Sequence, residues 1–285
     1  MQPPFPSFTT VWHNESYADI SPTRPELSAA GKTVIITGAS GGVGRATAIS
    51  FDRAGASKIV LLGRDEAKLQ GTQMALSCPS TMHSVAVTDD QGLRDVAAAV
   101  GTWDVLILAA GYLSAKNTLK DADTDEWWRS FETNVKGTMI TSKVFLPTAN
   151  PERAAIIGIT SGPLVFPPSA MIGASPYFSS KLALIKVIEF LAAENPSVFA
   201  AALHPGMVDT PVLRKFGTDP KDLPVDKAEL PGDFMVWLTS HEASFLNGRH
   251  VWANWDVPQL KEKAEDIKSG LLLTSGIYGW PYGMS

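Results

Sequence analysis

A tyrosine and a lysine four residues apart are the side chains in this sequence best suited to acid–base chemistry. Tyr177 and Lys181 stand in the run YFSSK at the start of an expected helix. Residues i and i+4 lie on one helical face, so the phenol and the ammonium can share a site. A free phenol has a pKa of about 10, and a nearby cation favours the phenolate and lowers that pKa. The pair predicts a tyrosine acid–base, the alternative being a surface tyrosine beside a solvated lysine.

A glycine-rich loop is the second chemical feature. In TVIITGASGGVGRATA, Gly38, Gly41, Gly42 and Gly44 follow an expected strand directly and precede an expected helix. Glycines allow the positive φ of a tight turn and a close approach of the backbone to phosphate, while the helix N-terminus supplies N–H donors. Because strand, loop and helix fall in the order of a dinucleotide-binding fingerprint, the run predicts nucleotide binding rather than a plain turn.

Short β-branched runs alternate with longer helical stretches from Lys32 onwards. The expected strands are Thr33–Thr37, Lys58–Leu62, His83–Val87, Val105–Ala109, Ala155–Ile159, Val198–Leu203 and His250–Ala253. The expected helices are 43–54, 65–77, 90–100, 124–146, 176–194 and 230–239. This alternation predicts an α/β, Rossmann-like, doubly wound and mostly parallel seven-stranded sheet with helices on both faces.

The rest of the chain surrounds this one expected domain, residues 32–255. Residues 1–31 lack periodicity and predict an irregular arm. The stretch 208–230 is punctuated by prolines and is too long for a plain connector, so it predicts a substrate lid. Residues 256–285 form a C-terminal extension with one amphipathic stretch, 259–269, and an aromatic tail.

Composition excludes several classes of protein. The net charge is −5 and the chain has no basic run, so a nucleic-acid partner is not expected. Cys78 is the only cysteine and the five histidines never take HExxH spacing, so neither a disulfide nor a metal site is expected. No apolar run approaches a membrane span and the first residues lack the pattern of a signal peptide, so we expect a cytoplasmic protein without membrane contact.

The spacing TGxxxGxG (Thr37, Gly38, Gly42 and Gly44) together with YxxxK resembles the short-chain dehydrogenase/reductase superfamily, in its main single-domain branch. The resemblance covers residues 32 to about 255, and the run FLNGRHVWANWDV is similar to fungal members. The resemblance implies a catalytic tetrad of Asn134, Ser161, Tyr177 and Lys181. In that tetrad Tyr177 gives a proton to the substrate oxygen and Ser161 orients it. Lys181 holds the nicotinamide ribose and acidifies Tyr177, while Asn134 supports a water-linked path to Lys181.

The resemblance also implies a set of cofactor contacts. They are Thr37, Gly38, Ser40, Gly41, Gly42, Val43, Gly44, Arg64, Val87, Ala110, Gly111, Pro205, Gly206, Val208 and Thr210, with Tyr177 and Lys181. His204, which precedes this last loop, is expected to pack rather than to act as a base.

The sequence departs from the family pattern at three places. The family's NNAG stands here as Leu108-Ala109-Ala110-Gly111, which predicts altered packing rather than lost catalysis. Ala86 replaces the Asp that commonly reads adenine, leaving the backbone of Val87 to bind it. The segment between Ser161 and Tyr177 is longer than usual, which predicts a reshaped substrate wall.

The end of the second strand predicts the cofactor. The acidic residue that selects NAD(H) is replaced by Gly63, and Arg64, which can pair with a 2′-phosphate, follows at once. Asp65 could contact the ribose instead, or cap the next helix. Arg45 could add a second cation. NADP(H) is therefore favoured over NAD(H).

Together these features predict an NADP(H)-dependent oxidoreductase that interconverts a ketone and a secondary alcohol. The alternatives are a dehydratase, isomerase or cyclase on the same fold, or a nucleotide-sensing module. A bulky apolar or aromatic substrate, of the kind found in fungal secondary metabolism, is suggested by the side chains that flank the expected pocket: Phe166, Met171, Ile172, Met207, Val212, Leu213 and Phe216. Trp127 and Trp128 open the long helix that relatives use for subunit contacts, so a homodimer or homotetramer is expected.

Overall fold

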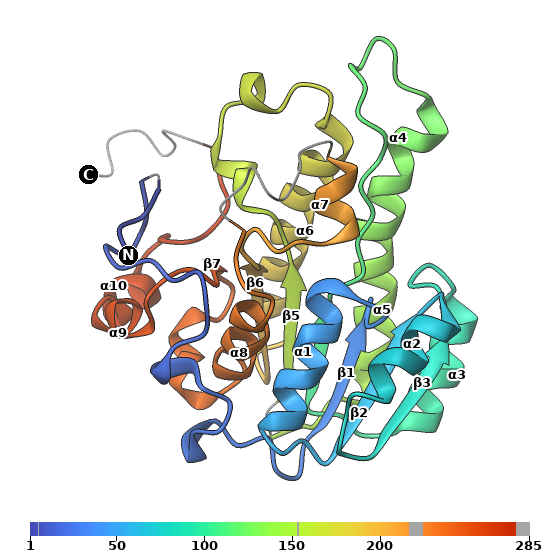
Figure 1. Cartoon of the computed structure of the whole chain (residues 1–285), viewed down its shortest axis with the longest axis vertical. Coiled ribbons are helices and arrows are strands. Elements are labelled where there is room, and N and C mark those ends of the chain that lie inside the picture. The colour runs from blue at the N-terminus through green and yellow to red at the C-terminus, as the bar shows by residue number, and fades with distance from the viewer. Residues whose placement is uncertain (5, 153, 217–224, 278–285) are drawn as a thin grey trace.

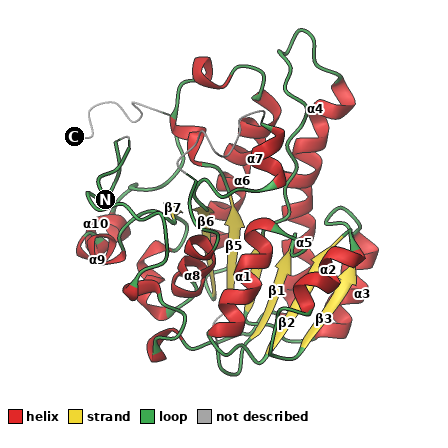
Figure 2. Cartoon of the chain, in the orientation of Figure 1, coloured by secondary structure: helices red, strands yellow, loops and turns green. Residues whose placement is uncertain are grey.

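Seven parallel strands form one sheet in the computed structural model, which describes residues 1–4, 6–152, 154–216 and 225–277 (Figures 1 and 2). The strands are β1 Thr33–Thr37, β2 Lys58–Gly63, β3 Ser80–Ser84, β4 Val105–Leu108, β5 Ala154–Ile159, β6 Val198–His204 and β7 His250–Trp252. Their order is β3-β2-β1-β4-β5-β6-β7, with every neighbouring pair parallel. The order reverses between β1 and β4, where doubly wound sheets bind their ligands. The predicted fold class is confirmed.

Helices cover both faces of the sheet (Figure 2). The described α-helices are α1 Gly42–Arg53, α2 Glu66–Gln73, α3 Asp90–Val100, α4 Thr124–Phe131, α5 Gly137–Phe145, α6 Ser175–Glu194, α7 Pro211–Lys215, α8 Glu229–Leu238, α9 Val257–Glu262 and α10 Ala264–Ser269. Along β1, Val34 and Ile36 pack on the face of α1, α2 and α8, while Ile35 packs on the face of α3, α5 and α6. This period of two buries both faces of each strand, and each fully buried side chain contributes about 1.5–3 kcal/mol.

The long helix predicted over 124–146 contains a π-helical turn. Helix α4 continues into the turn Glu132–Lys136 and then into α5. Asn134 lies inside this turn and is fully buried. Single π turns inside α-helices often mark functional positions.

The third strand begins three residues earlier than the sequence predicts. We expected His83–Val87, and the structure places β3 at Ser80–Ser84. The apolar alternation of Val85 and Val87 has another cause: Val85 packs into the core and Val87 lines a pocket beyond the strand. At the edge of the sheet, the hydrophobic pattern therefore marked packing after the strand rather than strand pairing.

The arm and the C-terminal residues pack against the face of α8. The arm is irregular apart from two short 3₁₀ turns, Ala18–Ile20 and Pro25–Leu27, and it buries Trp12, Ile20 and Leu27 in the core. In Figure 1 it runs beside α9 and α10, which occupy the predicted amphipathic stretch.

The expected lid is described at both of its ends. Helix α7 lies in its first part and α8 begins at its end, while residues 217–224, like the aromatic tail from 278, lie outside the described residues. No helix among the described residues is both long and apolar enough to cross a membrane.

Candidate active site

The glycine loop between β1 and α1 has the close contacts that require glycine. Gly38 has φ +66° and Gly42 has φ +51°, in the left-handed region. A Cβ on Gly44 would lie 2.4 Å from the Gly38 carbonyl oxygen, and one on Gly42 would lie 2.9 Å from the Thr210 methyl carbon. The loop after β6 therefore touches the glycine loop. The exposed N–H groups at the start of α1 form an anion cradle that suits a pyrophosphate.

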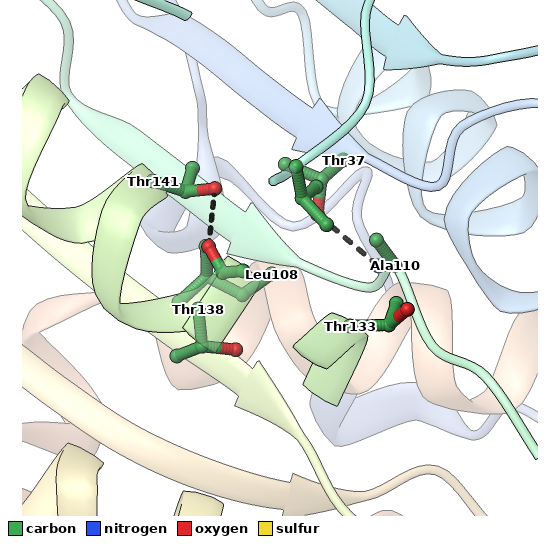
Figure 3. A pocket seen from close by; sticks show the side chains of 8 residues that line it. Thr37, Leu108, Ala110, Thr133, Thr138 and Thr141 are labelled. Atoms are coloured by element: carbon green, nitrogen blue, oxygen red, sulfur yellow. Dashed lines mark hydrogen bonds between the residues drawn. The ribbon is translucent and has the colours of Figure 1, made fainter. Parts of the chain in front are cut away.

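A pocket lies beside this loop, between the ends of β1 and β4 and helix α5 (Figure 3). Its lining is rich in threonine: Thr37, Val87, Leu108, Ala110, Thr133, Gly137, Thr138 and Thr141. The Thr37 hydroxyl donates to the Ile107 carbonyl at 3.2 Å and accepts from the Ala110 N–H at 3.1 Å. Thr37 thus ties β1 to Ala110, directly after Leu108 and Ala109, which replace the two family asparagines.

The end of β2 leaves one cation unpaired. Arg64 is exposed, and its guanidinium makes no hydrogen bond or ion pair with the described residues. A Cβ on Gly63 would lie 2.7 Å from the Ser40 hydroxyl oxygen, so an acidic side chain there would meet an obstacle. Asp65 caps α2 by accepting from the Lys68 N–H at 3.1 Å, and its hydrogen bond with the Lys68 side chain is the main cause of its lowered pKa. Of the two roles predicted for Asp65, the structure shows that of the helix N-cap.

Ser161 and Tyr177 come together at the carboxyl end of β5. Ser161 follows the strand, and Tyr177 stands in the first turn of α6. Burial raises the pKa of Tyr177 to about 12. The Ser161 hydroxyl lies close enough to the Tyr177 phenol to lower its pKa by hydrogen bonding, which offsets the effect of burial only in part. The lowered pKa predicted from the sequence is wrong in this structure, because burial outweighs every other influence on the phenol.

Lys181 is buried beneath the same tyrosine. Its Nζ lies 5.8 Å from the centre of the Tyr177 ring and donates to the Ile159 carbonyl at 2.6 Å. Burial lowers the pKa of Lys181 to about 8, because desolvation penalises the charged form. The group is therefore still mostly protonated at neutral pH, yet close to the point where it loses its charge.

Asn134 holds the backbone near this lysine. Its side chain accepts from the Tyr112 N–H at 2.8 Å and donates to the Tyr112 carbonyl at 3.0 Å and to the Ser180 hydroxyl at 2.9 Å. A Cβ on Gly111 would lie 3.6 Å from both Asn134 Oδ1 and Lys181 Nζ, so the two groups face one point. The structure thus gathers all four predicted tetrad residues around the ends of β4 and β5.

His204 supports the serine loop. Its Nδ1 accepts from the Gly162 N–H at 2.8 Å, and its ring packs edge-on against Trp252 with centroids 4.6 Å apart. Burial lowers the pKa of His204 to about 3, so the imidazole stays neutral at physiological pH. This placement agrees with a packing role, and it adds contact with the residue that follows Ser161.

A latch between α7 and the β4–α4 segment is a feature that the sequence did not suggest. Lys215 of α7 donates to the Leu113 carbonyl at 2.6 Å and lies 4.4 Å from the centre of the Tyr112 ring. Tyr112 in turn donates to Glu126 at 2.9 Å. These residues are far apart in sequence and have no shared motif. Beside them, Phe216 packs on Phe178, with ring centroids 5.8 Å apart.

A small pocket lies under this latch, where the substrate wall was expected. It is lined by Leu113, Ser114, Lys116, Gly173, Ala174, Lys215 and Phe216. Of the side chains expected at the substrate, Phe216 alone lines it, and Ile172 is 64% exposed.

The sheet and glycine loop are those of a Rossmann-type nucleotide-binding protein. Residues 32–221 match the family described as short chain dehydrogenase. The chain is 34% identical to the short chain dehydrogenase mpl6 of Monascus purpureus, over 94% of this chain and 96% of the relative. It is 32% identical to andI of Emericella variicolor, over 93% and 94%. The chain therefore belongs to the short-chain dehydrogenase family, an oxidoreductase family, and is similar to its fungal members.

A solved structure agrees on the fold. A short chain dehydrogenase from Shigella flexneri 2a, determined in complex with NADP, has a TM-score of 0.71. The match covers 81% of this chain and 99% of that one, at 20% identity.

Proposed function

We propose that the protein interconverts a ketone and a secondary alcohol by hydride transfer, with NADP(H) as cofactor and Tyr177 as the acid–base. The observation that carries this proposal is the placement of Ser161, Tyr177 and the buried Lys181 together at the carboxyl end of β5. A nucleotide-sensing module would have no use for a hydroxyl pair over a buried cation. The raised pKa keeps Tyr177 protonated at neutral pH, as a proton donor for carbonyl reduction must be.

Each residue of the tetrad has its own role in the reduction of the carbonyl group. Bound reduced nicotinamide supplies the hydride to the carbonyl carbon. Tyr177 gives its phenolic proton to the carbonyl oxygen, so that the π bond of C=O is replaced by new C–H and O–H bonds while the C–O single bond remains. Ser161 is placed to donate to the same oxygen and to orient it. Lys181 stabilises the phenolate left on Tyr177 and holds a ribose hydroxyl, and Asn134 fixes the backbone at Tyr112 beside Lys181.

NADP(H) is favoured over NAD(H) by the end of β2. The residues present fit the cofactor, because three glycines of the loop (Gly38, Gly42 and Gly44) lie too close to their neighbours for a side chain and the unpaired Arg64 follows the adjacent strand β2. A guanidinium recognises a phosphate by charge-assisted hydrogen bonds. Gly63 stands at the position of the acidic residue that would select NAD(H), so no carboxylate is present there to repel a 2′-phosphate. The NADP complex of the Shigella structure points the same way.

Arg64→Ala is expected to weaken NADPH binding by about tenfold or more, the scale of a charge-assisted bond, and to leave NADH binding almost unchanged. Titration of both cofactors by fluorescence measures this. Lys68→Ala is the matched control, since Lys68 is an exposed cation on α2 already paired with Asp65. Equal losses for NADPH and NADH would show that Arg64 does not read the 2′-phosphate.

The proposed substrate is a bulky apolar or aromatic carbonyl compound of secondary-metabolite type. Support comes from Phe216 and Leu113 at the pocket beneath the latch. A panel of aromatic and polyketide-like ketones, followed by the loss of NADPH absorbance, tests the reaction class. Conversion of a substrate without consumption of NADPH would favour the dehydratase, isomerase or cyclase alternative.

We also propose a homodimer or homotetramer formed through α4, α5 and α6. Large apolar side chains on these helices are about half exposed: Trp128 53%, Met139 47%, Leu182 51% and Phe190 58%. Phe190→Glu is expected to shift the protein towards the monomer in sedimentation velocity. Lys268→Glu, at an exposed position on α10 and so outside the proposed interface, serves as the charge control. A wild-type protein that sediments as a monomer would contradict the assembly.

The catalytic domain is proposed to be residues 32–255, with the arm 1–31 and the extension 256–285 packed around it and a lid near 208–230.

A cytoplasmic location is proposed because the only cysteine, Cys78, is free among the described residues.

A further inference from the structure

A buried aspartate outside the predicted site holds the loop that follows β6. Asp226 is only 7% exposed. Its Oδ2 accepts from the Met207 N–H at 2.6 Å, and its own N–H donates to the Met207 carbonyl at 2.9 Å. A Cβ on Gly206, which has φ +82°, would lie 2.5 Å from the same carboxylate oxygen. The carboxylate therefore lies directly against the backbone of residues 206 and 207.

Two asparagines from distant segments complete the surroundings of this carboxylate. Asn14 of the arm donates its amide to Asp226 Oδ1 at 2.5 Å, and the side-chain oxygen of Asn254, like the carboxylate, lies against Gly206, 3.3 Å from a Cβ placed there. The Asn14 carbonyl also accepts from the Lys227 N–H at 2.8 Å. A buried carboxylate is tolerated only when such donors surround it, so Asp226 and the segments that supply its donors are fixed together.

The arm is itself attached to the segment after β7. His13 and Asn254 exchange two hydrogen bonds, from the His13 N–H at 2.9 Å and from the Asn254 side chain at 2.8 Å. His13 Nε2 also lies 2.9 Å from Asp256 Oδ2, and its ring stacks on Tyr17 at 3.6 Å. The arm that carries Asn14 is thus anchored to the segment that carries Asn254.

We propose that Asp226 is a positioning residue that, with Asn14 and Asn254, holds the loop 205–210 in the conformation that receives the nicotinamide half of the cofactor. This inference rests on the proposed function for the role of the loop. The other end of the loop is held where Thr210 contacts Gly42. Fixing a binding loop at both ends removes its conformational freedom before the ligand arrives, and this is what preorganisation contributes to affinity.

Asp226→Asn tests the carboxylate with almost no change in shape. An asparagine side chain offers one acceptor oxygen and one NH₂ group. Because the Met207 N–H donates to one oxygen and the Asn14 amide donates to the other, the neutral amide replaces charge-assisted hydrogen bonds by weaker neutral ones. Asn14, whose own Oδ1 has no hydrogen-bond partner among the described residues, can turn to accept from the new NH₂ group. The loop is therefore expected to be held less tightly even though the volume is conserved.

Asp226→Asn is expected to weaken binding of the nicotinamide half of the cofactor and to leave binding of the adenosine half unchanged. NADPH affinity should fall by about tenfold, the effect of replacing charge-assisted hydrogen bonds by neutral ones. Affinity for 2′,5′-ADP, which carries the adenosine and the 2′-phosphate but no nicotinamide, should stay at the wild-type value. Asn14→Ala should give the same split to a smaller degree. A fall of both affinities together, or of neither, would overturn the proposal.

Asp233→Asn is the matched control. Asp233 is also buried, at 1% exposure, and also accepts from the arm, from the Ser16 hydroxyl at 2.6 Å, but it lies on α8 against Arg53. Asp233→Asn should leave the affinities for NADPH and for 2′,5′-ADP unchanged.

Hydrogen exchange of the backbone at 205–210 provides a readout that needs no cofactor. It should quicken in Asp226→Asn and stay unchanged in Asp233→Asn, and no quickening in Asp226→Asn would also overturn the proposal. If the wild-type protein bound no NADPH, the proposed function would fail, and this exchange would decide the effect of Asp226 on the loop.

Discussion

Tyr177→Phe is expected to lower the turnover number for carbonyl reduction by about 10²–10⁴, the usual contribution of a positioned general acid. The ring and its packing on Phe178 remain, while the proton donor and the hydrogen bond to Ser161 are lost. NADPH binding is expected to stay near the wild-type value, because the phenol hydroxyl is the only group removed. Single-turnover kinetics with a reducible ketone and a titration with NADPH measure the two quantities separately.

Ser161→Ala provides the comparison for this result. It removes the hydroxyl that orients the substrate oxygen but leaves the proton donor, so its loss of turnover should be smaller than that of Tyr177→Phe. Near-normal turnover in Tyr177→Phe would remove Tyr177 from the role of acid. An equal loss of NADPH affinity would instead show that the phenol holds the cofactor site together.

The parts of the fold that the sequence predicted well are those with local causes. Val34, Ile35 and Ile36 form a continuous β-branched run because both faces of β1 are buried, and such a run is visible in the sequence alone. The glycines of the loop were visible for a similar reason, since a positive φ at Gly38 and Gly42 leaves few other residues possible.

The parts that escaped prediction depend on contacts between distant residues. Asn14 and Asp226 are brought together by the packing of the arm, and no pattern near either residue indicates the other. The latch between Lys215 and Leu113 likewise joins residues that are far apart in the sequence. The edge strand β3 was misplaced because Val85 and Val87 are apolar for reasons of packing beyond the strand.

The candidate site falls between these two cases. The sequence places Ser161 directly after an expected strand and places Tyr177 and Lys181 at the start of the next expected helix. Because parallel strands have their carboxyl ends on the same side of a sheet, this order predicted that the three side chains lie on that side. Their electrostatics did not follow from spacing. The predicted effect of Lys181 on the phenol ignored burial, which raises the pKa of Tyr177 and lowers that of Lys181.

Those two pKa values lead to a prediction about pH. Lys181 has its pKa lowered to about 8, so it is charged below that pH and neutral above it. Tyr177, with a pKa of about 12, keeps its proton throughout this range. Reduction by the wild-type protein is therefore expected to decline as the pH rises through about 8, because the cation that stabilises the developing phenolate is lost while the proton donor remains. Initial rates at saturating NADPH, measured across this range, give the profile.

Lys181→Met is expected to lower turnover by about 10²-fold or more, in the range for groups that stabilise charge in the transition state, and also to weaken NADPH binding through the lost ribose contact. The remaining activity should no longer decline around pH 8, because the group that titrates there is gone. Lys186→Met is the matched control, since Lys186 lies on the same helix but is exposed and paired with Glu189. Lys186→Met should keep the wild-type turnover number and its decline as the pH rises through about 8. A decline near pH 8 that persisted in Lys181→Met would assign the titration to another group, and Lys181 would then have only a cofactor-binding role.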